Sequence, residues 1–166
     1  MSPILDQNTI EIISRSTTQT RRVGVRLGSL LLPGDVIGLA GDLGAGKTTL
    51  VQGVAAGWGS LDPVSSPTFM LVNMYRRTDG HKIYHLDAYR LNDLSEAIDL
   101  DIDEMMVEAS LIIEWADRIE AALPDERLWI TLVWAGETQR NLLVTAEGKR
   151  YQSLLADLRR QVYGVN

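Results

Sequence analysis

The sequence predicts an α/β fold, in which the strands of a central sheet alternate with helices. Residues 36–40 form a short apolar run that suits a buried parallel strand, and residues 50–58 then place apolar side chains at helical spacing. A second apolar run, residues 111–113, is of the same kind and ends in a carboxylate residue, Glu114. The 166 residues are enough to bury one hydrophobic core, so we expect a single domain over residues 1–166.

One strand and one helix are expected ahead of the first apolar run. Residues 9–14 alternate weakly between apolar and polar side chains, which is typical of a strand. The hydroxyl residues 16–18 are suitable helix N-caps, and apolar residues over 23–31 then form a helical stripe. The Pro-Gly pair at residues 33 and 34 ends that helix.

A glycine-rich turn, GDLGAGKT at residues 41–48, matches the phosphate-loop pattern GxxxxGK[ST]. It lies between an expected strand and an expected helix, where backbone N–H groups and the helix dipole favour a bound phosphate. Lys47 would reach the β- and γ-phosphates of a nucleotide, and the Thr48 hydroxyl would bind Mg²⁺. Gly57 and Gly59 are expected to close the helix. The turn therefore predicts a site for ATP and Mg²⁺.

Residues 61–67 form a loop rich in proline and serine, after which a hairpin is expected. Its strands are predicted at residues 69–76 and 82–87, around a turn at residues 78–81. Asp87 therefore lies at the end of a strand, where ligand-facing side chains of α/β sheets collect.

The C-terminal part of the chain predicts a helix, a strand pair and a last helix. Residues 93–108 are acidic and helix-like, and we expect them to cover one edge or face. Residues 128–135 and 142–145 suit a final pair of strands, and residues 151–162 form an amphipathic helix. The elements together predict a three-layer α/β/α fold of the P-loop NTPase kind, with a central mixed, mostly parallel sheet.

Two carboxylates at strand ends are candidates for the chemistry that a phosphate loop requires. An enzyme of this kind needs an acid that holds Mg²⁺ and positions a nucleophile. We expect Glu114 on the metal side and Asp87 to orient a water molecule, although either residue could instead cap a helix or form a surface ion pair. His85 could act as a base, but a single histidine within a strand is more often structural.

Two further features have alternative interpretations. Arg90 could contact phosphate or pair with the acidic residues that follow it. Ser66 and Thr68 could form a switch that senses the nucleotide, or a simple turn into the next strand.

The composition excludes some classes of site and partner. The chain has no cysteine, so disulfides and thiolate zinc sites are excluded, and its net charge is −6. Non-specific nucleic-acid binding depends on clustered positive charge, so we expect any contact with RNA to run through a partner. Residues 1–13 lack the apolar core of a signal peptide, and no stretch of the sequence is apolar over enough residues to span a membrane. We therefore expect a cytoplasmic protein without membrane contact.

Four motifs together resemble the TsaE (YjeE) family. The phosphate loop is followed in family order by SPTF at residues 66–69, YHLDAYRL at 84–91 and EW at 114–115. Many ATPases share the first motif, whereas the other three at these spacings are more specific. The resemblance implies a small bacterial ATPase needed to form threonylcarbamoyladenosine in tRNA. It also implies TsaD- and TsaB-type partner proteins, through which the protein reaches tRNA.

The resemblance extends to individual residues. It implies phosphate and magnesium roles for Lys47 and Thr48, a role in hydrolysis for Asp87 and a magnesium-associated role for Glu114. It also implies nucleotide contacts by Ser16 or Thr17 and by Arg140. The sequence departs from the family pattern at Ala88 and Ala116. These departures concern the surface that would contact the partner proteins. The expected site therefore comprises catalytic Lys47, Asp87 and Glu114, metal-binding Thr48 and Glu114, and nucleotide-binding Ser16, Gly41, Gly44, Ala45, Gly46, Lys47, Thr48, Thr49 and Arg140.

Two other functions share the phosphate loop. A small-molecule kinase would need an acceptor pocket and usually an arginine-bearing lid, and the acidic segment 92–108 argues against such a lid. A nucleotide-gated binding module would act through its ATP-bound shape, with little turnover.

Overall fold

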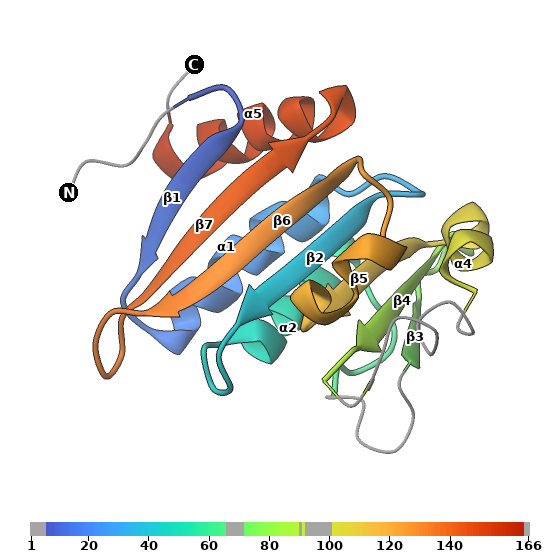
Figure 1. The fold of residues 1–166 in the computed structure, drawn as a ribbon, viewed down its shortest axis with the longest axis horizontal. Coiled ribbons are helices and arrows are strands. Elements are labelled where there is room, and N and C mark those ends of the chain that lie inside the picture. The colour runs from blue at the N-terminus through green and yellow to red at the C-terminus, as the bar shows by residue number, and fades with distance from the viewer. Residues whose placement is uncertain (1–5, 66–71, 90, 92–100, 165–166) are drawn as a thin grey trace.

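A seven-stranded sheet forms the centre of the molecule, with helices on both of its faces (Figure 1). The computed structural model describes residues 6–65, 72–89, 91 and 101–164. The strand order is β1-β7-β6-β2-β5-β4-β3. The predicted α/β class and the mixed sheet are thereby confirmed.

Most strands run in the same direction, as expected. The strands are β1 (Thr9–Ser14), β2 (Val36–Gly41), β3 (Val72–Arg76), β4 (Lys82–Asp87), β5 (Ser110–Glu114), β6 (Arg127–Trp134) and β7 (Arg140–Glu147). Parallel pairs join β6, β2, β5 and β4 at the centre, and antiparallel pairs add β3 at one edge and β7 and β1 at the other. It follows that only β3 and β7 oppose the other described strands. The carboxyl ends of the remaining strands meet at one edge of the sheet.

Two hydrophobic clusters place the sheet in the middle of three layers. The helices are α1 (Thr17–Ser29), α2 (Lys47–Trp58), α4 (Ile102–Glu108), η1 (Ala116–Ala122) and α5 (Lys149–Tyr163). Within β2, Ile37 and Leu39 pack into the cluster that contains residues of α1, α2 and α5. Val36 faces the opposite way and joins the cluster with Ile102 of α4 and Ile119 of η1. Because β2 is covered on both faces, its sequence is apolar throughout.

Glycines bring α1 and α2 into close contact. A Cβ added to Gly28 would lie 2.0 Å from the Val54 carbonyl oxygen, and one added to Gly57 would lie 2.0 Å from that of Val25. Gly59 caps α2 with a positive φ of 98°, as predicted. The expectation that Gly57 also closes the helix is wrong, because Gly57 lies inside α2 and packs against α1.

The boundaries of the other elements follow their local sequence signals closely. Ser16 is the N-cap of α1, and its side chain accepts a hydrogen bond from the Gln19 N–H at 3.1 Å. The β3–β4 hairpin and the antiparallel β6–β7 pair form as expected. The short helix η1 has no counterpart among the predicted elements. Parts of three predicted elements, the loop at residues 61–67, the strand at 69–76 and the helix-like segment at 93–108, lie outside the described residues, because 66–71 and 92–100 are not described. No helix in the described ranges has both the length and the apolarity to cross a membrane.

Candidate nucleotide-binding site

The candidate site lies at the edge of the sheet where the carboxyl ends of the same-direction strands meet (Figure 1). The glycine-rich loop follows β2, and Asp87 and Glu114 are the last residues of β4 and β5. Ser16 follows β1 at the same edge, and so does the turn between β6 and β7. In open α/β sheets this edge is where ligands bind.

The loop before α2 has a backbone path that requires glycine. Gly41, Gly44 and Gly46 have φ values of 141°, 79° and 104°, which residues other than glycine rarely adopt. A Cβ on Gly41 would also lie 2.5 Å from the Leu132 carbonyl oxygen of β6. Ala45 is fully buried, and its N–H donates to the Asp42 carbonyl oxygen at 3.0 Å within the loop. In this conformation the Ala45 amide therefore stabilises the loop itself.

The Lys47 side chain folds back over the start of the loop. Its ammonium donates to the carbonyl oxygens of Gly41 at 2.6 Å and Asp42 at 2.8 Å. It also lies 4.1 Å from the ring centroid of Trp115, a cation–π distance. Burial lowers the pKa of Lys47, and the Glu114 carboxylate opposes this shift. The loop thus holds a buried cation beside a carboxylate.

Glu114 connects the loop helix to the neighbouring strands. Its side chain is nearly buried, and one oxygen, Oε1, accepts a hydrogen bond from the Thr48 hydroxyl at 3.0 Å. The other oxygen, Oε2, lies 2.5 Å from His85 Nε2. His85 Nδ1 in turn lies 2.7 Å from the Tyr75 hydroxyl. A hydrogen-bonded chain therefore runs from β3 through β4 and β5 to the first turn of α2.

Asp87 lies directly beside Glu114 in the parallel register of β4 and β5. One of its carboxylate oxygens, Oδ1, accepts the Tyr89 N–H at 2.9 Å. Burial raises the pKa of Asp87, and the negative charge of Glu114 adds to the rise, while Lys47 opposes it. Both acids line one hollow together with Lys47 and Thr48.

The oxygen atoms in this hollow suit Mg²⁺ that is held mainly by a nucleotide. Thr48 supplies a hydroxyl and Glu114 a carboxylate, which are the hard oxygen ligands that Mg²⁺ prefers. No group of three or more acidic, histidine or cysteine side chains among the described residues could hold a metal alone. Mg²⁺ usually binds through one or two protein groups, with phosphates and water completing the set. The donor set here fits that kind of site.

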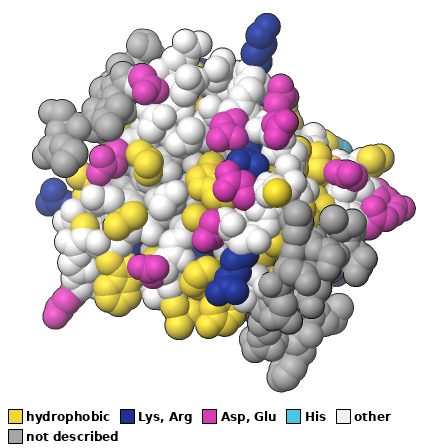
Figure 2. Space-filling model, in the orientation of Figure 1, with side chains coloured by type: hydrophobic (Ala, Val, Ile, Leu, Met, Phe, Trp, Pro, Cys, Tyr) yellow, Lys and Arg dark blue, Asp and Glu magenta, His cyan; other side chains and the backbone are white. Residues whose placement is uncertain are grey.

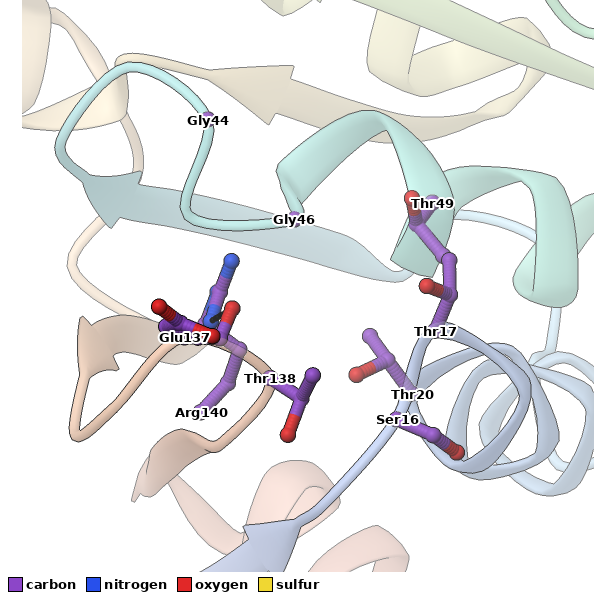
Figure 3. Close-up of a pocket in the computed structure, with 9 residues that line it drawn as sticks. All are labelled: Ser16, Thr17, Thr20, Gly44, Gly46, Thr49, Glu137, Thr138 and Arg140. Atoms are coloured by element: carbon purple, nitrogen blue, oxygen red, sulfur yellow. Dashed lines mark hydrogen bonds between the residues drawn. The ribbon is translucent and has the colours of Figure 1, made fainter.

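A second pocket adjoins the loop on the side of α1 (Figure 3). Ser16 and Arg140, both expected to contact a nucleotide, lie in this pocket, on opposite walls. Its lining comprises Ser16, Thr17, Thr20, Gly44, Gly46, Thr49, Glu137, Thr138 and Arg140. Gly44, Gly46 and Thr49 also line the hollow beside Glu114, so the two spaces share a wall. All the residues expected at a nucleotide site except Gly41 and Ala45 thus line one or the other of these two adjoining spaces.

Arg140 also organises the turn between β6 and β7. Its Nη1 atom donates to the carbonyl oxygens of Gly136 at 3.2 Å and Gln139 at 3.0 Å. The guanidinium lies 4.7 Å from the ring centroid of Trp134. Arg140 therefore shapes the wall of the pocket as well as lining it.

Sequence reasoning did not identify several residues that line these spaces. Glu137 and Thr138 come from a turn whose sequence carries a turn signal and no ligand signal. Trp115 belongs to the EW motif, but the motif does not indicate the contact of its ring with the Lys47 ammonium or its unusual backbone, with a φ of 57°. Ser66, Thr68 and Arg90, which had alternative interpretations, lie outside the described residues.

The chain is similar over most of its length to proteins of one family. A family model described as threonylcarbamoyl adenosine biosynthesis protein TsaE matches residues 14–142. The tRNA threonylcarbamoyladenosine biosynthesis protein TsaE of Bacillus subtilis is 42% identical over 144 residues, which cover 86% of this chain and 89% of that protein. The protein of the same name from Streptomyces coelicolor is 39% identical over 137 residues, covering 79% and 93%. The crystal structure of Bacillus subtilis YdiB matches with a TM-score of 0.74 at 34% identity, covering 92% of this chain and 95% of that one.

Proposed function

The chain belongs to the TsaE family of threonylcarbamoyl adenosine biosynthesis proteins, and we propose that it is an ATPase that supports this modification of tRNA. One observation carries the proposal. The hydroxyl of Thr48 and the carboxylate of Glu114 meet at the N-terminus of α2, in a hollow that Lys47 also lines. A hydroxyl, a carboxylate and an ammonium at a helix N-terminus suit a triphosphate with its Mg²⁺.

In this proposal the phosphates and the nucleoside of the nucleotide bind in different spaces, one on each side of the glycine loop. The hollow lined by Lys47, Thr48 and Asp87 takes the phosphates, because the cation and the positive end of the helix dipole are there. The pocket between Ser16 and Arg140 takes the nucleoside, because it lies across the glycine loop from the acids. At the glycines of the shared loop no Cβ blocks the approach of the backbone to the phosphate oxygens.

The proposed reaction is transfer of the γ-phosphoryl group of ATP to water, which gives ADP and phosphate. Mg²⁺, when bound, would neutralise charge on the β- and γ-phosphate oxygens. Lys47 stabilises the charge that develops between these phosphates. Asp87 accepts a hydrogen bond from the attacking water and orients it, and Glu114 holds Thr48 in place.

The surface charge supports an indirect role in tRNA modification. The net charge is −6, and acidic side chains are scattered over the face drawn in Figure 2. The coloured Lys and Arg side chains on that face lie apart from one another. Since tRNA binding depends on clustered positive charge, which neither the net charge nor this face supplies, we propose that TsaD- and TsaB-type proteins in the cytoplasm supply the tRNA contact.

Phosphate release measured with and without TsaD- and TsaB-type proteins tests the proposal. We expect Mg²⁺-dependent hydrolysis of ATP that rises when the partners are added. Absence of hydrolysis under all conditions, together with partner binding in ATP and not in ADP, would instead identify a nucleotide-gated binding module. A phosphorylated small-molecule acceptor would identify a kinase.

A further inference from the structure

His85 is fully buried beside the candidate site, and each nitrogen of its ring has a partner. Nε2 lies 2.5 Å from Glu114 Oε2, and Nδ1 lies 2.7 Å from the Tyr75 hydroxyl. Burial of a polar ring without partners would be costly, so both contacts are expected to persist. The contact with Glu114 connects His85 to the candidate site, because the same carboxylate accepts a hydrogen bond from Thr48.

The two oxygens of Glu114 are therefore held from different sides. Thr48 donates to Oε1, and His85 contacts Oε2. A carboxylate held at one oxygen can still rotate, whereas contacts at both oxygens fix the plane of the group. Partners of this kind set the orientation and the basicity of groups around a metal.

Tyr75 fixes the histidine ring from the other side. Its side chain is nearly buried, and its hydroxyl also lies 3.4 Å from the Ser65 carbonyl oxygen. Asn73, which faces His85 in the β3–β4 register, donates to the same carbonyl oxygen at 3.0 Å. The ring is thus held in one orientation, with Nε2 toward the carboxylate.

We propose that His85, held by Tyr75, is a positioning residue that presents the Glu114 carboxylate to the Mg²⁺ of the bound nucleotide. The inference rests on the proposed function and adds a determinant of Mg²⁺ affinity to it. A histidine that only filled the core would affect folding stability without a specific effect on Mg²⁺.

Two matched substitutions separate the contacts of the ring. The amide nitrogen of glutamine can reach the place of Nε2, whereas that of asparagine reaches only the place of Nδ1. His85→Gln therefore retains a donor to Glu114, and His85→Asn loses it. Binding of a fluorescent ATP analogue is measured over a series of Mg²⁺ concentrations, and binding of ADP is measured in EDTA.

In His85→Asn, we expect the Mg²⁺ concentration at half-saturation to rise about tenfold, as for other outer partners of metal sites. In His85→Gln it is expected to stay within about twofold of the unchanged protein, because the donor is retained. ADP binding in EDTA is expected to be the same in all three proteins.

Equal Mg²⁺ requirements in the three proteins would overturn the proposal. A similar rise in both variants would also overturn it, because the retained donor would then have no effect. If His85→Asn fails to fold, Tyr75→Phe replaces it, with an expected rise of about threefold from the loss of one hydrogen bond. An unchanged Mg²⁺ requirement in Tyr75→Phe would overturn the proposal. Failure of the unchanged protein to bind ATP with Mg²⁺ would instead refute the proposed function itself.

Discussion

Asp87 and Glu114 face each other in the parallel register of β4 and β5, yet their carboxylates have different partners. Glu114 is bonded to Thr48 and His85, whereas Asp87 accepts a backbone N–H from Tyr89. The two acids lie at the same edge of the sheet and line the same hollow. Under the proposed function these environments favour different roles, with Glu114 as the acid fixed beside Thr48 and Asp87 as the acid that orients water.

Substitution of each acid by its amide separates these roles. We expect Glu114→Gln and Asp87→Asn each to lower ATP turnover at least about tenfold, which corresponds to about 1.4 kcal/mol of transition-state stabilisation. Glu114→Gln is also expected to raise the Mg²⁺ concentration required for ATP binding, because it removes the charge beside Thr48. Asp87→Asn should leave that concentration unchanged. Steady-state phosphate release and Mg²⁺ titrations measure the two effects, and circular dichroism checks the fold. Unaltered turnover in both variants would show that the choice of acids is wrong.

Removal of the Lys47 ammonium should strongly weaken productive ATP binding. The ammonium is buried at the start of the loop, where it can exchange its carbonyl contacts for phosphate oxygens. Loss of two charge-assisted hydrogen bonds predicts binding weaker by on the order of 100-fold in Lys47→Ala, or about 3 kcal/mol. Calorimetric titration with Mg²⁺ and ATP measures this loss. Lys149→Ala is the control, since Lys149 is exposed at the start of α5. Normal affinity in Lys47→Ala would refute the assignment of the loop.

The parts of the molecule that could be predicted from sequence depend on local signals. The apolar run of β2 and the glycines of the loop indicate a strand and a phosphate loop within a few residues of each other. Ser16 is a helix cap by its residue type and its place before an apolar stripe. Strand ends are also local signals, so the sequence alone indicates Asp87 and Glu114 as candidates.

The parts that could not be predicted depend on which strands become neighbours. His85 and Glu114 are 29 residues apart, and they meet only because β4 pairs with β5. The sequence around a single histidine in a strand does not identify its partner, so the sequence alone favours a structural role for His85. Glu137 and Thr138 likewise reach the pocket because β6 lies next to β2 in the sheet.

An acid titration of the β3–β4 turn tests a second electrostatic feature. The side chain of Arg77 and the backbone N–H of His81 hold the pKa of Asp79 down to about 2. Because the folded-state pKa lies below the ordinary value of 3.8, the charged form stabilises the turn above about pH 4. That stabilisation is lost as the pH falls toward 2. The ¹³C shift of the Asp79 carboxyl carbon should therefore titrate near pH 2, and Arg77→Ala should move the midpoint toward the ordinary value. A midpoint near 4 in the unchanged protein would contradict the ion pair.

Addition of a methyl group at Gly57 should destabilise the protein, although alanine is the better helix former. Helix propensity alone predicts that Gly57→Ala stabilises α2 by about 1 kcal/mol. The new Cβ would, however, lie 2.0 Å from the Val25 carbonyl oxygen, so α1 and α2 would have to separate. Overpacking of this kind costs about 1–3 kcal/mol. Over most of this range the cost is larger than the gain in helix propensity. Urea unfolding measures the difference. Ala56→Gly, at an exposed neighbouring position, is the control and should cost about 1 kcal/mol through propensity alone. Greater stability of Gly57→Ala would show that the two helices do not pack as closely as the glycines indicate.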